Sequence, residues 1–183
     1  MLTRHHTSYQ GLRCISGHDA PDGMHRNQHA TRAGKQDIKE HNTEKLRAVA
    51  YALIDIASVY RSDGRFGEAL GHYENAASMA EQAGDRYAHT EAICGIAEAH
   101  LGSGRVAVAL ENYERAARVA GEIESLYLKG KALDGMAEIT LRTRGKAAAR
   151  IYWREAYDIF AQIDVPEAAT VKLRLHALDA SDS

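Results

Sequence analysis

The chain has 183 residues, a formal net charge of -2 and two cysteines, Cys14 and Cys94. This near-neutral balance provides no basic stripe for a phosphate backbone, so we expect no direct binding to nucleic acid. The two cysteines lie too far apart for a disulfide framework or a zinc ribbon, and no apolar run approaches the roughly 20 residues that span a bilayer. The first 30 residues also lack the apolar core of a secretion signal, so we expect a cytoplasmic protein.

Residues 1–41 differ in composition from the rest of the chain. They hold more than half of the ten histidines and show no apolar periodicity, which predicts a disordered tail. Imidazole and thiolate groups suit zinc or nickel, and the tail offers several. The candidates are His5, His6, His18, His25, His29 and Cys14. Their spacings match no known finger, so we expect neither a metal nor another cofactor. The first helix is expected to begin at Asn42 or Thr43, whose side chains can cap it.

The region after residue 42 repeats one pattern every 40 positions. The first half of each copy carries two apolar residues and an alanine: Leu53, Ile93 and Leu133, then Ile56, Ile96 and Met136, then Ala57, Ala97 and Ala137. The second half carries an alanine, an aromatic residue and a second alanine: Ala69, Ala109 and Ala149, then Tyr73, Tyr113 and Trp153, then Ala76, Ala116 and Ala156. Self-similarity at a fixed period indicates a repeat architecture.

Each copy predicts two helices joined by a tight turn. In the first copy, steps of three and four mark one buried face per helix: Leu46, Val49, Leu53, Ile56 and Tyr60, then Ala69, Tyr73, Ala76, Ala80 and Ala83. Breakers separate the two halves of the copies at Ser62-Asp63-Gly64, Gly102-Ser103-Gly104 and Arg142-Thr143-Arg144-Gly145. Between copies, Ala83-Gly84-Asp85 is a clear stop and start, whereas around Glu122 only Ser125 is a plausible cap.

The end of the chain predicts one further helix. Asp164-Val165-Pro166-Glu167 is typical of a helix start with proline in its first turn. Val171, Leu175 and Leu178 then share one face, so this helix is expected to cover the open end of the stack. The resulting domain boundaries are a tail at 1–41, a helical repeat domain at 42–179 and a frayed end at 180–183.

This pattern of small and aromatic residues resembles the tetratricopeptide repeat over about residues 50 to 163. Thr140 departs from it, since the family usually has a ring there, and the period of 40 exceeds the common 34. Longer-period arrays of this kind resemble those at the C-termini of large actinobacterial antibiotic-regulatory transcription factors. The resemblance implies an all-α, right-handed solenoid of three hairpins plus a C-terminal capping helix.

Motifs for catalysis are weak in this sequence. Arg144-Gly145-Lys146-Ala147 lacks the earlier glycine of a phosphate-binding loop and the Ser or Thr that would hold magnesium. Cys94 has no histidine at helical neighbour spacing, so we interpret it as structural and not as a nucleophile. We therefore expect a protein that is not an enzyme.

By the resemblance, the first helix of each hairpin lines a concave groove that binds a protein or peptide. The implied groove residues are Tyr51, Ile54, Ser58, Arg61, Glu91, Cys94, Glu98, Leu101, Lys131, Asp134, Glu138 and Arg142. Glu98, Asp134 and Glu138 are expected to form an acidic patch that favours a basic segment, although a merely solvated charged face explains them equally well. The Lys and Asn pattern of the family's carboxylate clamp is missing. Self-association stays open.

The sequence thus predicts a non-catalytic interaction module of the tetratricopeptide type that binds a protein or peptide and no membrane. The alternative is a regulatory role, as a counterpart of the C-terminal array in the antibiotic-regulatory factors. The chain shows no DNA-reading helix pair that would make this direct.

Overall fold

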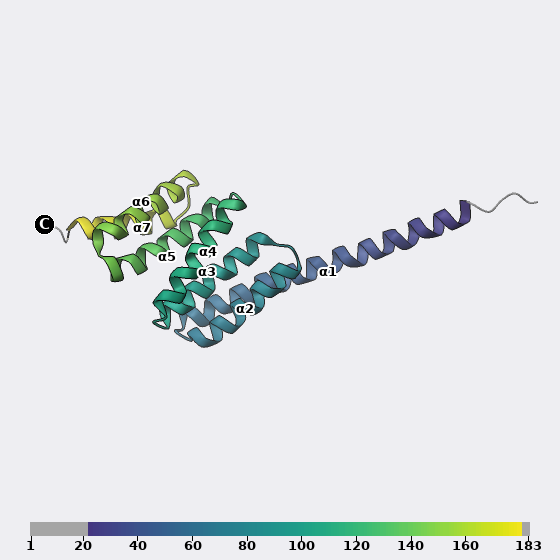
Figure 1. Cartoon of the computed structure of the whole chain (residues 1–183), viewed down its shortest axis with the longest axis horizontal. Helices are drawn as coiled ribbons and strands as arrows, with labels where there is room; N and C mark the ends of the chain where they lie inside the picture. Colours follow the sequence, from purple (N-terminus) through teal and green to yellow (C-terminus); the bar gives the residue numbers. More distant parts are fainter. Residues whose placement is uncertain (1–21, 181–183) are drawn as a thin grey trace, which may run out of the picture. The chain divides into compact units, whose positions relative to one another are not determined.

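The structure, a computed structural model, describes residues 22–180, and within this range the chain forms seven helices and no strand. The helices are α1 (Asp22–Ser62), α2 (Phe66–Gln82), α3 (Arg86–Gly102), α4 (Val106–Glu122), α5 (Leu126–Arg144), α6 (Lys146–Gln162) and α7 (Glu167–Ala180). By its internal contacts the chain divides into two units, Met1–Lys39 and Glu40–Ser183. In the second unit, each helix from α2 to α6 packs against the next one in the chain, as Figure 1 shows. The prediction of an all-α solenoid of hairpins is confirmed.

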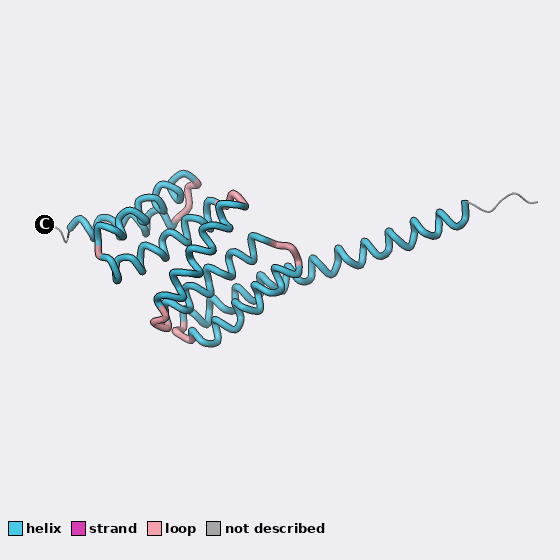
Figure 2. Tube along the Cα trace, in the orientation of Figure 1, coloured by secondary structure: helices cyan, strands magenta, loops and turns pink. Residues whose placement is uncertain are grey.

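Short turns of nearly constant shape separate the helices, and Figure 2 shows them as brief loops. Gly84 has a φ of +67°, in the left-handed region that favours glycine, and the Asp85 side chain then caps α3 by accepting from the Ala88 N–H at 2.9 Å. In the turn between α4 and α5, Glu124 occupies the position equivalent to Gly84 and also has a left-handed backbone conformation, with φ +55°. Ser125 then caps α5. In the third hairpin, Gly145 is the single residue between α5 and α6, and its φ is +86°. The weak turn signal around Glu122 therefore still marks a real turn.

Three clusters of buried residues form a continuous core in the second unit, and alanines recur in all of them. Their small size lets the helices approach closely enough for rings to fill the remaining space. A Cβ atom on Gly95 would lie 2.3 Å from the Tyr73 ring, and one on Gly135 would lie 2.1 Å from the Tyr113 ring. Tyr73 of α2 and Tyr113 of α4 thus each pack directly on a glycine of the following helix, and the two contacts lie 40 positions apart.

The predicted buried face of α1 is partly wrong. Val49 and Ile56 are 46% and 43% exposed, whereas Ala50, Ile54 and Ala57 are buried. The predicted face of α2, by contrast, is buried at all five positions, from Ala69 to Ala83. Periodicity finds an apolar face, but it does not show whether a neighbouring helix is present to cover that face.

The first helix begins earlier than predicted. α1 starts at Asp22 and not at Asn42 or Thr43, so 22–41 are helical and the expected disordered tail is wrong for this part. The side chains at 35–42 are exposed, which explains why no apolar periodicity marks this helical stretch. The rest of the predicted tail, including His5, His6, Cys14 and His18, lies outside the described residues, as do 181–183.

The last helix caps the stack as predicted. Val171 and Leu178 are buried against α6, and Leu175 is packed beside them. Val171 and Leu178 lie 39 positions after the buried Ala132 and Ile139 of α5, so α7 is shifted by one residue from the 40-residue repeat. With this shift, Lys172, His176 and Asp179 are exposed on the flank of α7 beside α6, while Leu173 is exposed on the side away from the buried face.

Candidate functional site

A groove in the second unit runs across the odd-numbered helices. Its main pocket has a volume of about 420 Å³, and an adjoining pocket of about 400 Å³ adds Arg142. The charged and polar lining comprises Arg61 of α1, Glu98 of α3, Tyr127, Lys131, Asp134 and Glu138 of α5, and Glu167 and Arg174 of α7. We call these residues, together with Leu101 and Arg142, the groove. Four successive odd-numbered helices thus contribute to one surface.

Seven of the twelve residues implied by the family resemblance lie in this groove: Arg61, Glu98, Leu101, Lys131, Asp134, Glu138 and Arg142. Ile54 and Cys94 do not, since they are 7% and 0% exposed and belong to the core. Their prediction as groove residues is wrong. Tyr51, Ser58 and Glu91 line neither pocket, and the Ser58 hydroxyl donates to the Asp55 carbonyl of its own helix at 2.8 Å.

One chain of ion pairs links three odd-numbered helices. Glu98 of α3 lies between two cations, with Arg61 Nε at 3.0 Å from its Oε2 and Lys131 Nζ at 3.7 Å from its Oε1. Burial alone would lower the pKa of Lys131, but the nearby carboxylates, chiefly Glu98, raise that pKa above its ordinary value. Lys131 therefore stays charged, and a single carboxylate connects α1 to α5 through α3.

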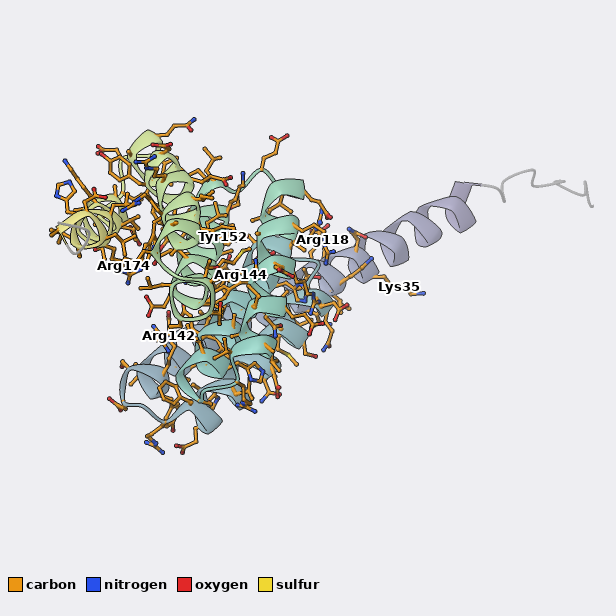
Figure 3. All side chains as sticks on the ribbon, turned by 60° about the vertical axis from the view of Figure 1, so that its left-hand side comes forward. Lys35, Arg118, Arg142, Arg144, Tyr152 and Arg174 are labelled. Atoms are coloured by element: carbon orange, nitrogen blue, oxygen red, sulfur yellow. The ribbon has the colours of Figure 1, made fainter. Side chains whose placement is uncertain are left out.

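A second set of contacts joins α5 to α6 and α7. The Trp153 indole N–H donates to Asp134 Oδ1 at 2.8 Å, and Arg174 pairs with the same carboxylate. Arg174 also lies over the Trp153 ring, 6.0 Å from its centroid. Figure 3 labels Arg174 on α7 and Arg142 on α5; Arg142 pairs with Glu138 at 2.9 Å, one helical turn away.

The expected acidic patch is not present as such. Glu98, Asp134 and Glu138 each lie against at least one cation. Across the groove, four carboxylates (Glu98, Asp134, Glu138 and Glu167) balance four cations (Arg61, Lys131, Arg142 and Arg174). The groove is therefore polar and mixed in charge, and it carries no net attraction for a purely basic partner.

Sequence reasoning missed the contribution of α7 to the groove. Tyr127 donates its hydroxyl to Glu167 Oε1 at 2.8 Å, and its pKa is raised to about 12 by burial and by this carboxylate. Glu167 and Arg174 lie seven residues apart, so they share one face of α7 and reach the groove together. That spacing of opposite charges on the expected capping helix is the signal that would have found them.

The described part of the chain holds neither an activated thiol nor a candidate metal cluster. Burial raises the pKa of the Cys94 thiol to about 12, so at neutral pH it is a poor nucleophile. Within residues 22–180, no cluster of three or more His, Cys, Asp or Glu side chains is arranged to hold a metal ion. None of the helices in the same range combines the length and apolar character that crossing a bilayer requires.

Stacked hairpins with a groove along their first helices define an α-helical repeat protein of the solenoid class. The sequence profile of the tetratricopeptide repeat matches residues 48–122, which extend from within α1 to the end of α4. The match supports a tetratricopeptide-repeat protein, a class whose domains generally serve as non-catalytic scaffolds for protein interaction. No curated protein matches the chain.

Proposed function

We propose that the chain is a protein-interaction module whose groove binds an extended segment of a partner protein that carries both acidic and basic side chains. The observation that carries this proposal is the alternation of charge along the groove. A purely basic segment would compete with Arg61, Lys131 and Arg174 for carboxylates that are already paired. A segment with both signs can exchange these pairs for new ones across the interface, so no buried charge is left unpaired.

The exposure of the groove favours such an exchange. The side chains of its ion pairs remain 23–55% exposed, so water screens them and each pair contributes little to folding. Leu101, half-buried at the side of the groove, supplies an apolar contact beside the charges. Tetratricopeptide repeats and the concave surface of a solenoid both suit this mode of recognition.

The test begins with peptides selected from a random display library on the immobilised full chain. Their affinities are then measured by calorimetry for the native chain, for a groove variant with Glu98→Gln and Glu138→Gln, and for a control variant. The control carries Glu111→Gln and Glu114→Gln, which make the same charge change at exposed positions of α4 outside the groove. Circular dichroism confirms that both variants keep the native helicity.

The groove variant should bind about tenfold more weakly and with a smaller salt dependence, while the control binds as the native chain does. Selected peptides should contain both acidic and basic residues. Affinity that ignores the groove variant but falls in the control would show that partners bind the outer helices. Selection of only polybasic peptides would contradict the mixed-charge specificity and return the proposal to the acidic groove expected from the sequence.

The regulatory alternative rests on the sequence resemblance alone. It predicts that the native partner is a DNA-binding or polymerase-linked protein. The test is cross-linking in cell extract followed by mass spectrometry, with the groove variant as the control. Recovery of such a protein by the native chain, and not by the groove variant, would favour this alternative.

A further inference from the structure

One face of α1 is apolar and exposed. Val49, Ile56 and Val59 are 46%, 43% and 60% exposed, and Ala52 is exposed between them. Their spacing of three, four and three residues places them in one stripe along the helix. We call these four residues the α1 outer face. Such a stripe in water is unfavourable unless another surface covers it.

The corresponding faces of α3 and α5 are covered. Forty positions after Ala52 and Val59 lie Ala92 and Ala99, both fully buried and packed with residues of α2. Eighty positions after them lie Ala132 and Ile139, which are 0% and 1% exposed beside residues of α4. In the interior of the stack, this face therefore always contacts the preceding helix. Only in α1 does the described structure leave it open.

A preceding hairpin of the same kind would not fit on this face. In α3 and α5 the stacking tyrosine rests on Gly95 and Gly135, where even a Cβ atom would lie 2.3 Å and 2.1 Å from its ring. The equivalent residue of α1 is Asp55, which carries a full charged side chain at that place. The α1 outer face therefore calls for a partner that approaches in a different orientation from a further repeat.

The residues of this face are symmetric about Ile54. Val49 and Val59 lie five positions on either side of Ile54, and Ala52 and Ile56 lie two. Lys45 and Asp63 lie nine positions on either side of Ile54, and both are exposed. Asp63 is the first residue after α1, and its N–H still donates to the Val59 carbonyl at 3.1 Å, so it continues the line of the stripe. Neither side chain forms an ion pair within the described part of the chain. An antiparallel copy of α1 would place Val49 on Val59, Ala52 on Ile56 and Lys45 on Asp63, each twice.

We propose that a second copy of this chain covers the α1 outer face, with the two α1 helices antiparallel about a two-fold axis that crosses this face at the level of the buried Ile54. Self-complementarity is the requirement for a symmetric dimer, and this stripe meets it in the order of its apolar residues and in the charges of Lys45 and Asp63. Apolar layers flanked by opposite charges are the arrangement of antiparallel helix pairs. The apolar contact comprises only four side chains per copy, so the dimer is weak, with a dissociation constant in the micromolar range or above.

The first experiment measures the mass of the full chain by sedimentation over a concentration series up to about 1 mM, a range set by the weak affinity expected. The native chain should dimerise, and Ile56→Asp should raise the dissociation constant at least about tenfold, because two charges would meet the opposing Ala52. The matched control is Ile151→Asp, at an isoleucine that is 69% exposed on α6. It should dimerise as the native chain does. A native chain that stays monomeric, or a dimer that tolerates Ile56→Asp, overturns the proposal.

Charge exchange then tests the orientation. In a dimer of the Lys45→Asp variant, two carboxylates would face each other at each end of the α1 pair. In a dimer of the Asp63→Lys variant, two ammonium groups would do so. Each variant alone should therefore dimerise several-fold more weakly than the native chain. Mixing the two variants restores both opposite-charge contacts and should yield a heterodimer of native affinity. Failure of the mixture to associate better than either variant alone would exclude the antiparallel arrangement. The groove takes no part in these contacts, so its own test stands or falls separately.

Discussion

The two ends of the repeat domain are built differently. At the C-terminal end, α7 buries Val171 and Leu178 against α6, and its flank beside α6 carries the exposed Lys172, His176 and Asp179. At the N-terminal end, α1 buries its inner side, while its outer side exposes Val49, Ile56 and Val59. A solenoid needs a polar outer surface on its terminal helix to remain soluble as a monomer. Among the described residues, α7 exposes a single large apolar side chain, Leu173, whereas Val49, Ile56 and Val59 form a stripe on α1, which is why we assign a partner to the N-terminal end.

A one-residue shift places polar side chains on the flank of α7 beside α6. Lys172, His176 and Asp179 lie 39 positions after Leu133, Ala137 and Thr140 of α5, all of which are buried against the rest of the stack. The same helix face is thus apolar within the stack and polar at its end. On the α1 outer face, polar residues do not replace the apolar ones. Ala52 and Ile56 are as apolar as Ala92 and Ile96, which lie 40 positions later.

The largest effect is expected inside the stack, at the contact that distinguishes it from the N-terminal end. Gly135→Ala places a methyl group 2.1 Å from the Tyr113 ring, so α4 and α5 must separate. We expect a loss of about 3 kcal/mol in the free energy of unfolding, measured by urea denaturation. Asp55→Ala, at the equivalent place on α1, should change it by less than about 0.5 kcal/mol.

Gly71→Ala is the matched control for this prediction. A Cβ atom at Gly71, within α2, meets nothing within 4 Å, so the substitution should stabilise the helix by about 0.5–1 kcal/mol. Destabilisation by Gly71→Ala, or a native-like stability of Gly135→Ala, would show that close ring-to-glycine packing does not hold the hairpins together.

The second prediction compares the same substitution at both ends. Val171→Ala removes two methyl groups from a side chain that is 1% exposed, so it should cost about 2 kcal/mol through lost burial and the cavity that remains. Val59→Ala removes them from a side chain that is 60% exposed. At protein concentrations well below the micromolar range, where the proposed dimer dissociates, it should cost less than about 0.5 kcal/mol. Thermal denaturation of both variants measures the difference, and equal losses would mean that the N-terminal face is covered within the monomer.

The sequence predicts the repeat well because its signals are local. The 40-residue period and the breakers define each hairpin, and the alanines at fixed positions define the closely packed faces. The errors arise where the answer depends on neighbours. Ile54 and Cys94 were assigned to the groove by their place in the family pattern, but the following hairpin covers them. Arg174 and Asp134 are 40 positions apart, and only the packing of α7 on α6 brings them together.

The third prediction concerns Glu91, beside Lys131 at the interior of the repeat domain. Burial raises the pKa of Glu91, although Lys131 opposes this effect. The folded state therefore binds this proton more readily than the unfolded state, so ionisation of Glu91 disfavours folding at neutral pH and the penalty disappears as the pH falls below its unfolded pKa. Glu91→Gln should thus stabilise the chain by roughly 0.5 kcal/mol at pH 7 and have no effect at acid pH. Denaturation at both pH values checks this, and a loss of stability at pH 7 would show that attraction to Lys131 outweighs burial.

The smallest effect on stability is expected from deletion of residues 1–39. The described side chains at 35–42 are exposed, and the first buried residue of α1 is Ala50, so the deletion should leave the thermal midpoint within about 2 °C of the native value. It should nevertheless reduce the molar ellipticity at 222 nm by the contribution of 18 helical residues, since α1 begins at Asp22. Unchanged ellipticity per molecule would instead restore the disordered tail expected from composition, because a helix without packing contacts is only marginally stable in water. A large fall in the midpoint would contradict both descriptions and show that the first unit contributes to the stability of the repeat domain.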